Sequence, residues 1–298
     1  MKFLNYWAYG LRVASEMEFP ELYTRFEDGI PDLRIHLRSI NLLEGKIDQN
    51  ATYSFKSHNN IFYVHVKSVA FYEISNGINI TIYPYQDALI SDIRVYCLSN
   101  AFAAALHQRK IMPLHAGAIR NNDKISLIMG NTGSGKSTLL YHLMQKGYKV
   151  FSDDVVVVST RKGSNETSAT SSYPMMKLWK HQMKGMGLDN GQQVRSGVDK
   201  FPFLFHEQFD IHARKIEKII ILKVVSGLTT CTVRKLKGIE SVILLFNQIY
   251  RKEYLNRTDY ISSLSLLSSM ANNIPCYEIS RPMFHSTEIE LANLFTKI

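Results

Sequence analysis

The sequence is poor in cysteine and lacks any long apolar run. It holds three cysteines, Cys97, Cys231 and Cys276, and their positions do not match the spacing of metal ligands. We therefore expect free thiols and no disulfide framework, as is usual in a reducing compartment. No segment approaches the roughly 20 apolar residues that span a membrane, and residues 1–5 show no signal-peptide pattern. These absences predict a cytoplasmic protein with no membrane partner.

The sequence also lacks a concentrated basic patch, although its formal net charge is +9. The densest basic runs, around Arg214 and Arg234, are short, and the other basic residues are spread along the chain. A clustered patch is the usual footprint of nucleic-acid binding, so nucleic acid is an unfavoured partner. An acidic peptide or a nucleotide would account for the charge equally well. A homo-oligomer is compatible with the sequence, which leaves the oligomeric state open.

The pattern of apolar residues predicts two domains. Residues 1–109 are expected to form a smaller β-rich domain with a long linking helix, and residues 110–298 a second, larger domain. Short apolar runs between residues 32 and 83, separated by turn-prone residues, predict two hairpins and an antiparallel sheet. Residues 87–108 carry apolar side chains near the helical period and predict one helix. The overall class is α/β, or α+β over both domains, with a mixed sheet in the second.

A glycine loop at residues 130–137 makes the second domain, residues 110–298, the predicted nucleotide-binding catalytic domain. The apolar run Ile125–Met129 leads into the loop and helix-forming residues follow, so the order is strand, loop and helix. The spacing fits G-x-x-x-x-G-K-[ST], in which main-chain N–H groups and a helix N-terminus face phosphate oxygens, while the lysine reaches the β- and γ-phosphates and the hydroxyl joins Mg²⁺ coordination. The alternative is a glycine turn without a ligand. The expected cradle comprises Gly130, Asn131, Thr132, Gly133, Ser134, Gly135, Lys136, Ser137 and Thr138.

Two acids follow the next predicted strand, Tyr148–Phe151. Later apolar strands end without a carboxylate, so Asp153 and Asp154 are the acids that a strand of this unit delivers. A crossover connection returns the chain in parallel, which places these acids at the edge of the sheet that carries the glycine loop. Such an acid can hold Mg²⁺ or accept the proton of an attacking hydroxyl. Adjacent strand residues point to opposite faces, and the sequence does not decide which acid takes which role. A solvated acidic turn is the alternative.

His115 is a further candidate, because residues 113–119 predict a strand that forms a hairpin with the strand of the glycine loop. In that hairpin an imidazole near the γ-phosphate could orient groups or relay a proton. A histidine that only packs in the sheet is the alternative. Residues 161–172 are polar and lack periodicity, so they predict a surface loop or the tip of a hairpin.

The segments His115–Ile119, Gly130–Ser137 and Phe151–Val155 together resemble the catalytic domain of the HPr kinase/phosphorylase family. The resemblance implies ATP and Mg²⁺ as cofactors and a protein serine as the phosphate acceptor. By position it implies that Lys136 and Ser137 bind phosphate and metal, that Asp153 and Asp154 share the general-base and metal roles, and that His115 assists. The family's carboxy-terminal signature for HPr binding and phosphorolysis is not found, so neither the regulation of sugar uptake nor the reverse reaction is expected of this chain.

Outside these segments, Tyr9–Glu16 and Tyr173–Trp179 are similar to stand-alone HPr-kinase-like proteins. Some of these act in lasso-peptide pathways, which implies a serine in a ribosomally made precursor peptide as the acceptor. Arg195 and Lys200 are expected to neutralise charge at the transferring phosphoryl group, although solvated loop cations are an equal alternative. Two other functions stay open: a small-molecule kinase of the same fold, and a nucleotide-gated peptide-binding module without transfer.

Overall fold

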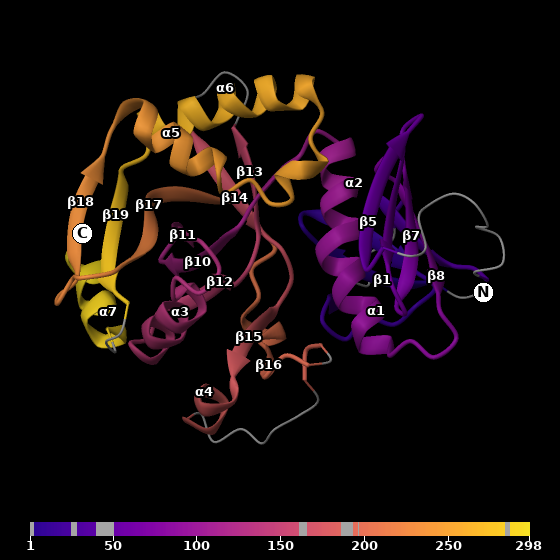
Figure 1. Ribbon diagram of the computed structural model, residues 1–298, viewed down its shortest axis with the longest axis horizontal. Coiled ribbons are helices and arrows are strands. Elements are labelled where there is room, and N and C mark those ends of the chain that lie inside the picture. The colour runs from indigo at the N-terminus through magenta and orange to yellow at the C-terminus, as the bar shows by residue number, and fades with distance from the viewer. Residues whose placement is uncertain are drawn as a thin grey trace. The chain divides into compact units, whose positions relative to one another are not determined.

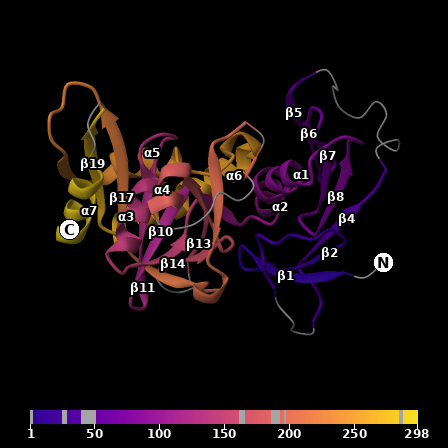
Figure 2. The same ribbon diagram turned by 90° about the horizontal axis from the view of Figure 1, so that it is seen from below.

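The computed structural model describes residues 3–24, 29–39, 51–160, 166–185, 193–195, 197–283 and 287–298. The chain forms two compact units, which Figures 1 and 2 show from two directions. The first comprises Met1–Ile111 and Trp179–Pro202, and the second comprises Met112–Leu178 and Phe203–Ile298. The sequence analysis expected a single boundary near residue 110 and placed segment 179–202 in the second domain. The division differs at this segment, which belongs to the first unit and contacts it through Arg195 and Tyr96.

The first unit contains an eight-stranded sheet with the order β3-β1-β2-β4-β8-β7-β6-β5. The neighbours from β5 to β8 are antiparallel, as the turn residues predict, but β4 pairs in parallel with both β2 and β8. The sheet is therefore mixed, whereas the sequence predicts an antiparallel sheet. Parallel neighbours need a connection longer than a hairpin turn. The strands are β1 (Leu4–Ala8), β2 (Leu11–Ser15), β3 (Tyr23–Thr24), β4 (Leu33–Leu37), β5 (Tyr53–His58), β6 (Ile61–Val66), β7 (Ala70–Ser75) and β8 (Asn79–Pro84).

A helical segment follows this sheet and begins at Ile90, three residues later than the sequence predicts. It consists of α1 (Ile90–Tyr96), a π-helical turn (Cys97–Ala101) and α2 (Phe102–Gln108). The hydroxyl of Tyr9 donates to the Leu98 carbonyl within the π-helical turn, at 2.9 Å. The main-chain hydrogen bonds of a π-helical turn differ from those of an α-helix, and the Tyr9 hydroxyl gives the Leu98 carbonyl a hydrogen-bond donor there.

The second unit contains a nine-stranded sheet whose path runs β12-β10-β11-β17-β14-β13-β9. Strand β19 also pairs with β17, and β18 pairs with β19; β11, β17 and β19 are parallel to one another, and β10 and β11 form the predicted antiparallel hairpin. The strands are β9 (Met112–Leu114), β10 (Ala116–Asn121), β11 (Lys124–Gly130), β12 (Lys149–Ser152), β13 (Val156–Thr160), β14 (Thr167–Ser171), β17 (Arg214–Val225), β18 (Thr232–Leu236) and β19 (Cys276–Pro282).

Strands β13 and β14 form an antiparallel hairpin, in line with the hairpin alternative for residues 161–172, but residues 167–171 belong to a strand and not to its tip. Residues 161–165 lie outside the described residues. The Ser/Thr-rich sequence of β14 hides the strand from a hydropathy pattern, yet threonine favours strands, and burial alternates from Thr167 to Ser171. A separate two-stranded sheet joins β15 (Met175–Trp179) to β16 (Lys200–Leu204), and the short helix α4 (Lys180–Gly185) follows β15.

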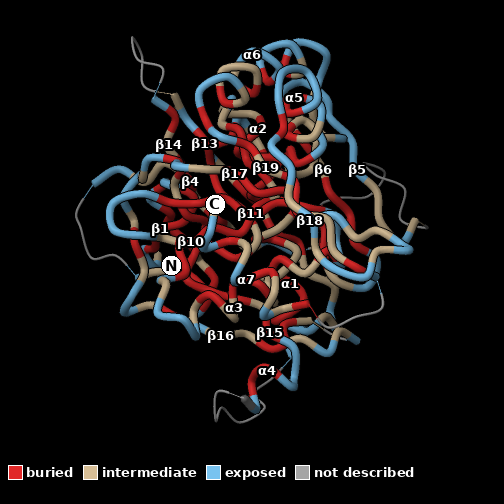
Figure 3. The backbone as a smooth tube through the Cα atoms, turned by 90° about the vertical axis from the view of Figure 1, so that its left-hand side faces the viewer, coloured by how far each residue is buried: buried red, intermediate tan, exposed pale blue. Residues whose placement is uncertain are grey.

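Helices cover both faces of the large sheet (Figure 1). Helices α5 (Gly238–Phe246) and α6 (Arg257–Asn273) lie on one face, and α3 (Lys136–Gln145) packs with α7 (Glu288–Lys297) on the other. The inner strands are buried along most of their length, as the red segments of Figure 3 show. Core side chains on the face of α5 and α6 include Ile125, Leu127, Met129, Ile219, Ile221, Val242, Leu245, Leu267 and Met270.

The mixed α/β class is thus confirmed. The three cysteines are free, as predicted. In the part of the chain that the structure describes, we find no helix that combines the length and hydropathy of a transmembrane span.

Candidate active site

The glycine loop connects the end of β11 to the start of α3. Gly130 has a φ of 141°, and a Cβ at this position would lie 2.5 Å from the carbonyl oxygen of Leu222. A residue with a side chain therefore cannot replace it without moving β17. Gly135 is the N-cap of α3 with a φ of 103°, and no side chain caps this helix. The first main-chain N–H groups of α3 thus lack intrahelical partners, and such N–H groups at a helix N-terminus can bind an anion.

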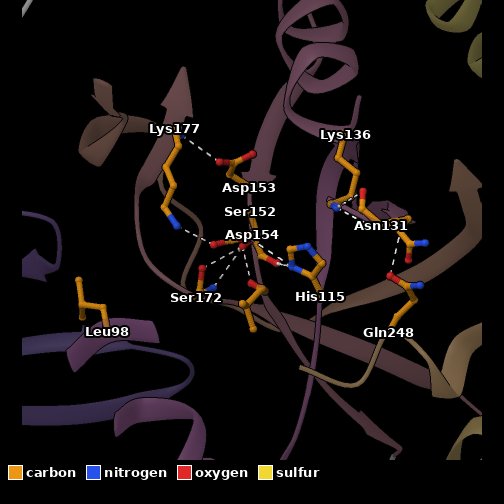
Figure 4. Close-up of polar contacts among 12 residues, drawn as sticks. Leu98, His115, Asn131, Lys136, Ser152, Asp153, Asp154, Ser172, Lys177 and Gln248 are labelled. Carbon is orange, nitrogen blue, oxygen red and sulfur yellow. Dashed lines mark hydrogen bonds and ion pairs between the residues drawn. The ribbon is translucent and has the colours of Figure 1, made fainter. Parts of the chain in front are cut away.

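Two polar side chains of the loop are buried in it. The ammonium of Lys136 donates to the carbonyl oxygen of Gly130 at 2.6 Å and lies 3.5 Å from that of Asn131 (Figure 4). The hydroxyl oxygen of Ser134 is buried without a hydrogen-bond partner. A buried hydroxyl that lacks a partner costs free energy, and a phosphate oxygen would satisfy it. The loop therefore fits a phosphate group.

Asp153 follows β12 and is 3% exposed. Its Oδ2 accepts the main-chain N–H of Lys177 at 2.9 Å, while its Oδ1 is buried without a hydrogen-bond partner. Burial, and then the charge of Asp154, raise the pKa of this carboxyl, although the main-chain N–H and the charge of Lys177, followed by the nearby Ser137 hydroxyl, oppose the shift. A buried carboxylate oxygen without a partner, beside the hydroxyl of the glycine loop, fits a bound cation. Magnesium in phosphate-transfer sites takes one or two protein carboxylates together with phosphate oxygens and water.

Asp154 points to different partners. Its Oδ2 lies 2.6 Å from the ammonium of Lys177 on β15, and its Oδ1 lies 3.3 Å from Nδ1 of His115. Burial raises the pKa of this carboxyl, but Lys177 and then His115 outweigh burial and hold it well below its usual range. Reciprocally, Asp154 outweighs the effect of burial on Lys177 and raises the pKa of that ammonium. The two neighbouring acids therefore have opposite pKa shifts and separate environments.

His115 lies between β9 and β10 and interrupts the single strand that the sequence predicts. Its main-chain N–H donates to the carbonyl oxygen of Gln248 at 2.7 Å. Its Nδ1 lies 3.0 Å from the carbonyl oxygen of Asp154, and a carbonyl oxygen can only accept. Nδ1 therefore carries the hydrogen, and in the neutral imidazole the lone pair is then on Nε2. The ring of Tyr250 lies 5.9 Å from the imidazole, and burial, followed by the charge of Asp154, raises the pKa of Tyr250 to about 12.

The structure thus brings His115, Asp153 and Asp154 together and places Asp153 beside Ser137 of the loop. Sequence reasoning missed three residues that hold this arrangement: Lys177, Gln248 and Arg281. Gln248 accepts the main-chain N–H of Gly130 on its Oε1 at 3.2 Å, so it connects the start of the loop to His115. No sequence signal marks it, since it follows α5 in an irregular turn. Arg281 ends the parallel strand β19, and this position is a usual one for ligand contacts.

Arg195 and Lys200 belong to the first unit. The guanidinium of Arg195 donates to the hydroxyl of Tyr96 at 3.1 Å, and the ammonium of Lys200 lies 4.8 Å from the centre of the Trp179 ring. Both cations are thus engaged by aromatic residues of that unit. Among the described residues, no group of three or more His, Cys, Asp or Glu side chains could hold a metal ion.

No protein-family model matches this chain, and no curated protein matches it. Among solved structures, the chain is similar to the Hpr(Ser) kinase/phosphatase from Coxiella burnetii, with 14% sequence identity. The match covers 62% of this chain and 94% of that chain, with a TM-score of 0.32. A likeness of this size carries no argument about activity, which has to come from the site itself.

Proposed function

We propose that this chain is an ATP- and Mg²⁺-dependent kinase that transfers the γ-phosphate to the serine hydroxyl of a peptide or protein. One observation carries the proposal: the unpartnered, buried Oδ1 of Asp153 beside the hydroxyl of Ser137. These two oxygens could coordinate a cation, and the cation would lie next to the glycine loop, which is suited to bind a phosphate group. In the proposed division of the chain, the second unit is the catalytic domain.

Each residue of the site has a proposed role. Lys136 and the loop amides would bind the phosphates, and Ser137 with Asp153 would hold Mg²⁺. Bound Mg²⁺ supplies charge neutralisation on the phosphate oxygens. His115 would accept the proton of the serine hydroxyl. Asp154 would fix the tautomer of the imidazole, as the acid of a catalytic triad does.

The transfer step balances with these residues. The serine oxygen bonds to the γ-phosphorus while the bond from that phosphorus to the bridging oxygen of ADP breaks. The serine proton passes to Nε2 of His115, which the contact with Asp154 leaves as the acceptor nitrogen. Positioned proton transfer of this kind contributes about 10²–10⁴-fold to a rate.

The acceptor is proposed from the resemblance of Tyr9–Glu16 and Tyr173–Trp179 to stand-alone HPr-kinase-like proteins. It would be a serine in a ribosomally made, lasso-type precursor peptide. The charge neutralisation that the sequence analysis expects of Arg195 and Lys200 stays a prediction. No observation favours a small metabolite as the acceptor.

The experiment is incubation of the full chain with ATP, Mg²⁺ and serine-containing peptides, followed by mass spectrometry. We expect a gain of one phosphate on a serine peptide and none on the matched alanine peptide. Asp153→Asn and Asp154→Asn should each lower the rate by orders of magnitude. Phosphate transfer to free serine or another small molecule, with peptides left unmodified, would contradict the peptide assignment. ATP binding without any transfer would contradict the kinase itself.

A further inference from the structure

Arg281, at the end of β19, lies against the outside of the glycine loop. Its Nε donates to the carbonyl oxygen of Ser134 at 2.9 Å, and its Nη2 to that of Gly133 at 3.3 Å. A Cβ built on Gly135 would lie 3.5 Å from Nε of this arginine. The guanidinium thus contacts two consecutive carbonyl groups at the point where the loop enters α3.

Among the described residues, the charge of Arg281 has no carboxylate partner. Its remaining contact is from Nη1 to the carbonyl oxygen of Pro282, at 3.3 Å. The arginine of the neighbouring strand β18, Arg234, is instead neutralised by Glu240 and Glu278. An arginine whose nitrogens all bind main-chain carbonyls beside a phosphate-sized loop adds an uncompensated positive charge there.

These contacts fix the direction of the loop amides. A trans peptide unit is planar, so its carbonyl oxygen and its N–H point in opposite directions. Because Arg281 binds the carbonyl of Ser134, the N–H of Gly135 in the same peptide unit points away from the arginine. The preceding unit is held twice: Arg281 binds the carbonyl of Gly133, and the N–H of Ser134 donates to the carbonyl of Asn131 at 3.0 Å.

We propose that Arg281 is a positioning residue that holds the glycine loop in its phosphate-binding shape before the ligand arrives. This inference rests on the proposed function for its ligand, the polyphosphate tail of a nucleoside triphosphate. The glycines of the loop are free to adopt many conformations, and ordering them on binding would weaken affinity. By binding the carbonyl groups of Gly133 and Ser134, Arg281 holds both peptide units in place and leaves the N–H of Gly135 directed away from itself, where it can meet a phosphate oxygen.

The test compares Arg281→Met and Arg281→Lys with the control Lys223→Met, which removes one positive charge from an exposed position two residues from the end of β17. Two quantities are measured on the full chain: hydrogen–deuterium exchange of residues 130–137 without ligand, and the affinities for inorganic tripolyphosphate and for Mg²⁺-ATP by calorimetry. We expect faster exchange and about 10–100-fold weaker binding of both ligands in Arg281→Met, from the loss of two charge-assisted hydrogen bonds. The control should match the wild type.

Arg281→Lys separates position from charge, because lysine keeps the charge but lacks the rigid fork of donors. The inference requires that Arg281→Lys behave like Arg281→Met. Wild-type exchange of the loop in Arg281→Met would overturn it, and so would wild-type affinity of Arg281→Lys. If the wild type binds neither ligand, the proposed function fails, yet the exchange of the ligand-free loop still decides whether Arg281 holds it.

Discussion

The ammonium of Lys177 lies 2.6 Å from Oδ2 of Asp154, and both side chains are largely buried in the second unit, with exposed fractions of 22% and 27%. Lys177 contacts the neighbouring acid as well, but there it offers only a main-chain N–H. One residue thus gives two adjacent carboxyl groups different partners. The pKa of Asp153 is raised by burial and by the charge of Asp154, whereas, despite burial, Lys177 and His115 hold the pKa of Asp154 well below its usual range.

Replacement of Lys177 by methionine should destabilise the protein by about 3 kcal/mol, because it leaves the carboxylate of Asp154 without its counter-charge in a mostly buried place. In the double variant Lys177→Met, Asp154→Asn this penalty should shrink, since the uncompensated charge is gone. Urea unfolding of the two single variants and the double variant measures the coupling. Strict additivity of the two single effects would show that the ion pair has no such role.

Alanine at two glycines of the loop should have unequal effects. Gly130→Ala places a Cβ 2.5 Å from the Leu222 carbonyl, whereas a Cβ at Gly133 meets nothing within 4 Å. Both glycines have positive φ, so each substitution costs about 1–2 kcal/mol of backbone strain. Only Gly130→Ala adds a collision with β17. We expect it to abolish ATP binding and lower the melting temperature further than Gly133→Ala; similar losses in both variants would mean that the contact with Leu222 is unimportant.

Exchange of His115 for glutamine should reduce the turnover number by about 10²–10⁴-fold, the range for loss of a positioned proton acceptor. The affinity for ATP should change little, since the imidazole contacts Asp154 and not the glycine loop. His142→Gln on α3 is the matched control and should retain full turnover. Turnover with peptide substrate and ATP affinity are measured separately. Wild-type turnover of His115→Gln would mean that another residue accepts the serine proton.

The first unit has its own pH-sensitive group, Glu16. Burial raises its pKa, but the main-chain N–H of Leu37 and the side chains of His36 and Arg38 outweigh burial and lower it to about 2, against an ordinary value of 4.5. A depressed folded-state pKa means that the ionised form contributes stability above pH 4.5 and loses it as the pH falls toward 2.

We therefore expect Glu16→Gln to cost about 1.5–3 kcal/mol at neutral pH, the range for hydrogen bonds to a charged group. The difference from the wild type should narrow between pH 4.5 and pH 2, where the wild-type carboxyl becomes protonated. Unfolding of both proteins across this range is the measurement. A difference that is constant with pH would indicate lost packing and not lost charge.

Local sequence patterns predicted the strand, glycine loop and helix, the hairpin that begins directly after His115 and the position of the acid pair after β12. These features depend on residues close together in the chain or on the rule that parallel strands end at one edge. Lys177 and Gln248 were not predictable, because they reach the site through β15 and through the turn after α5, and only tertiary packing brings these segments to it. The strand β14 was missed since its serines and threonines carry no apolar alternation.

The central claim is that Asp153 and Ser137 hold Mg²⁺ against the phosphates bound by the glycine loop. Calorimetric titration of ATP, with and without Mg²⁺, into the wild type and Asp153→Asn tests it most directly. We predict that Mg²⁺ strengthens ATP binding to the wild type, and that Asp153→Asn loses this strengthening while it keeps its affinity for metal-free ATP. Equal strengthening by Mg²⁺ in the two proteins would contradict the account.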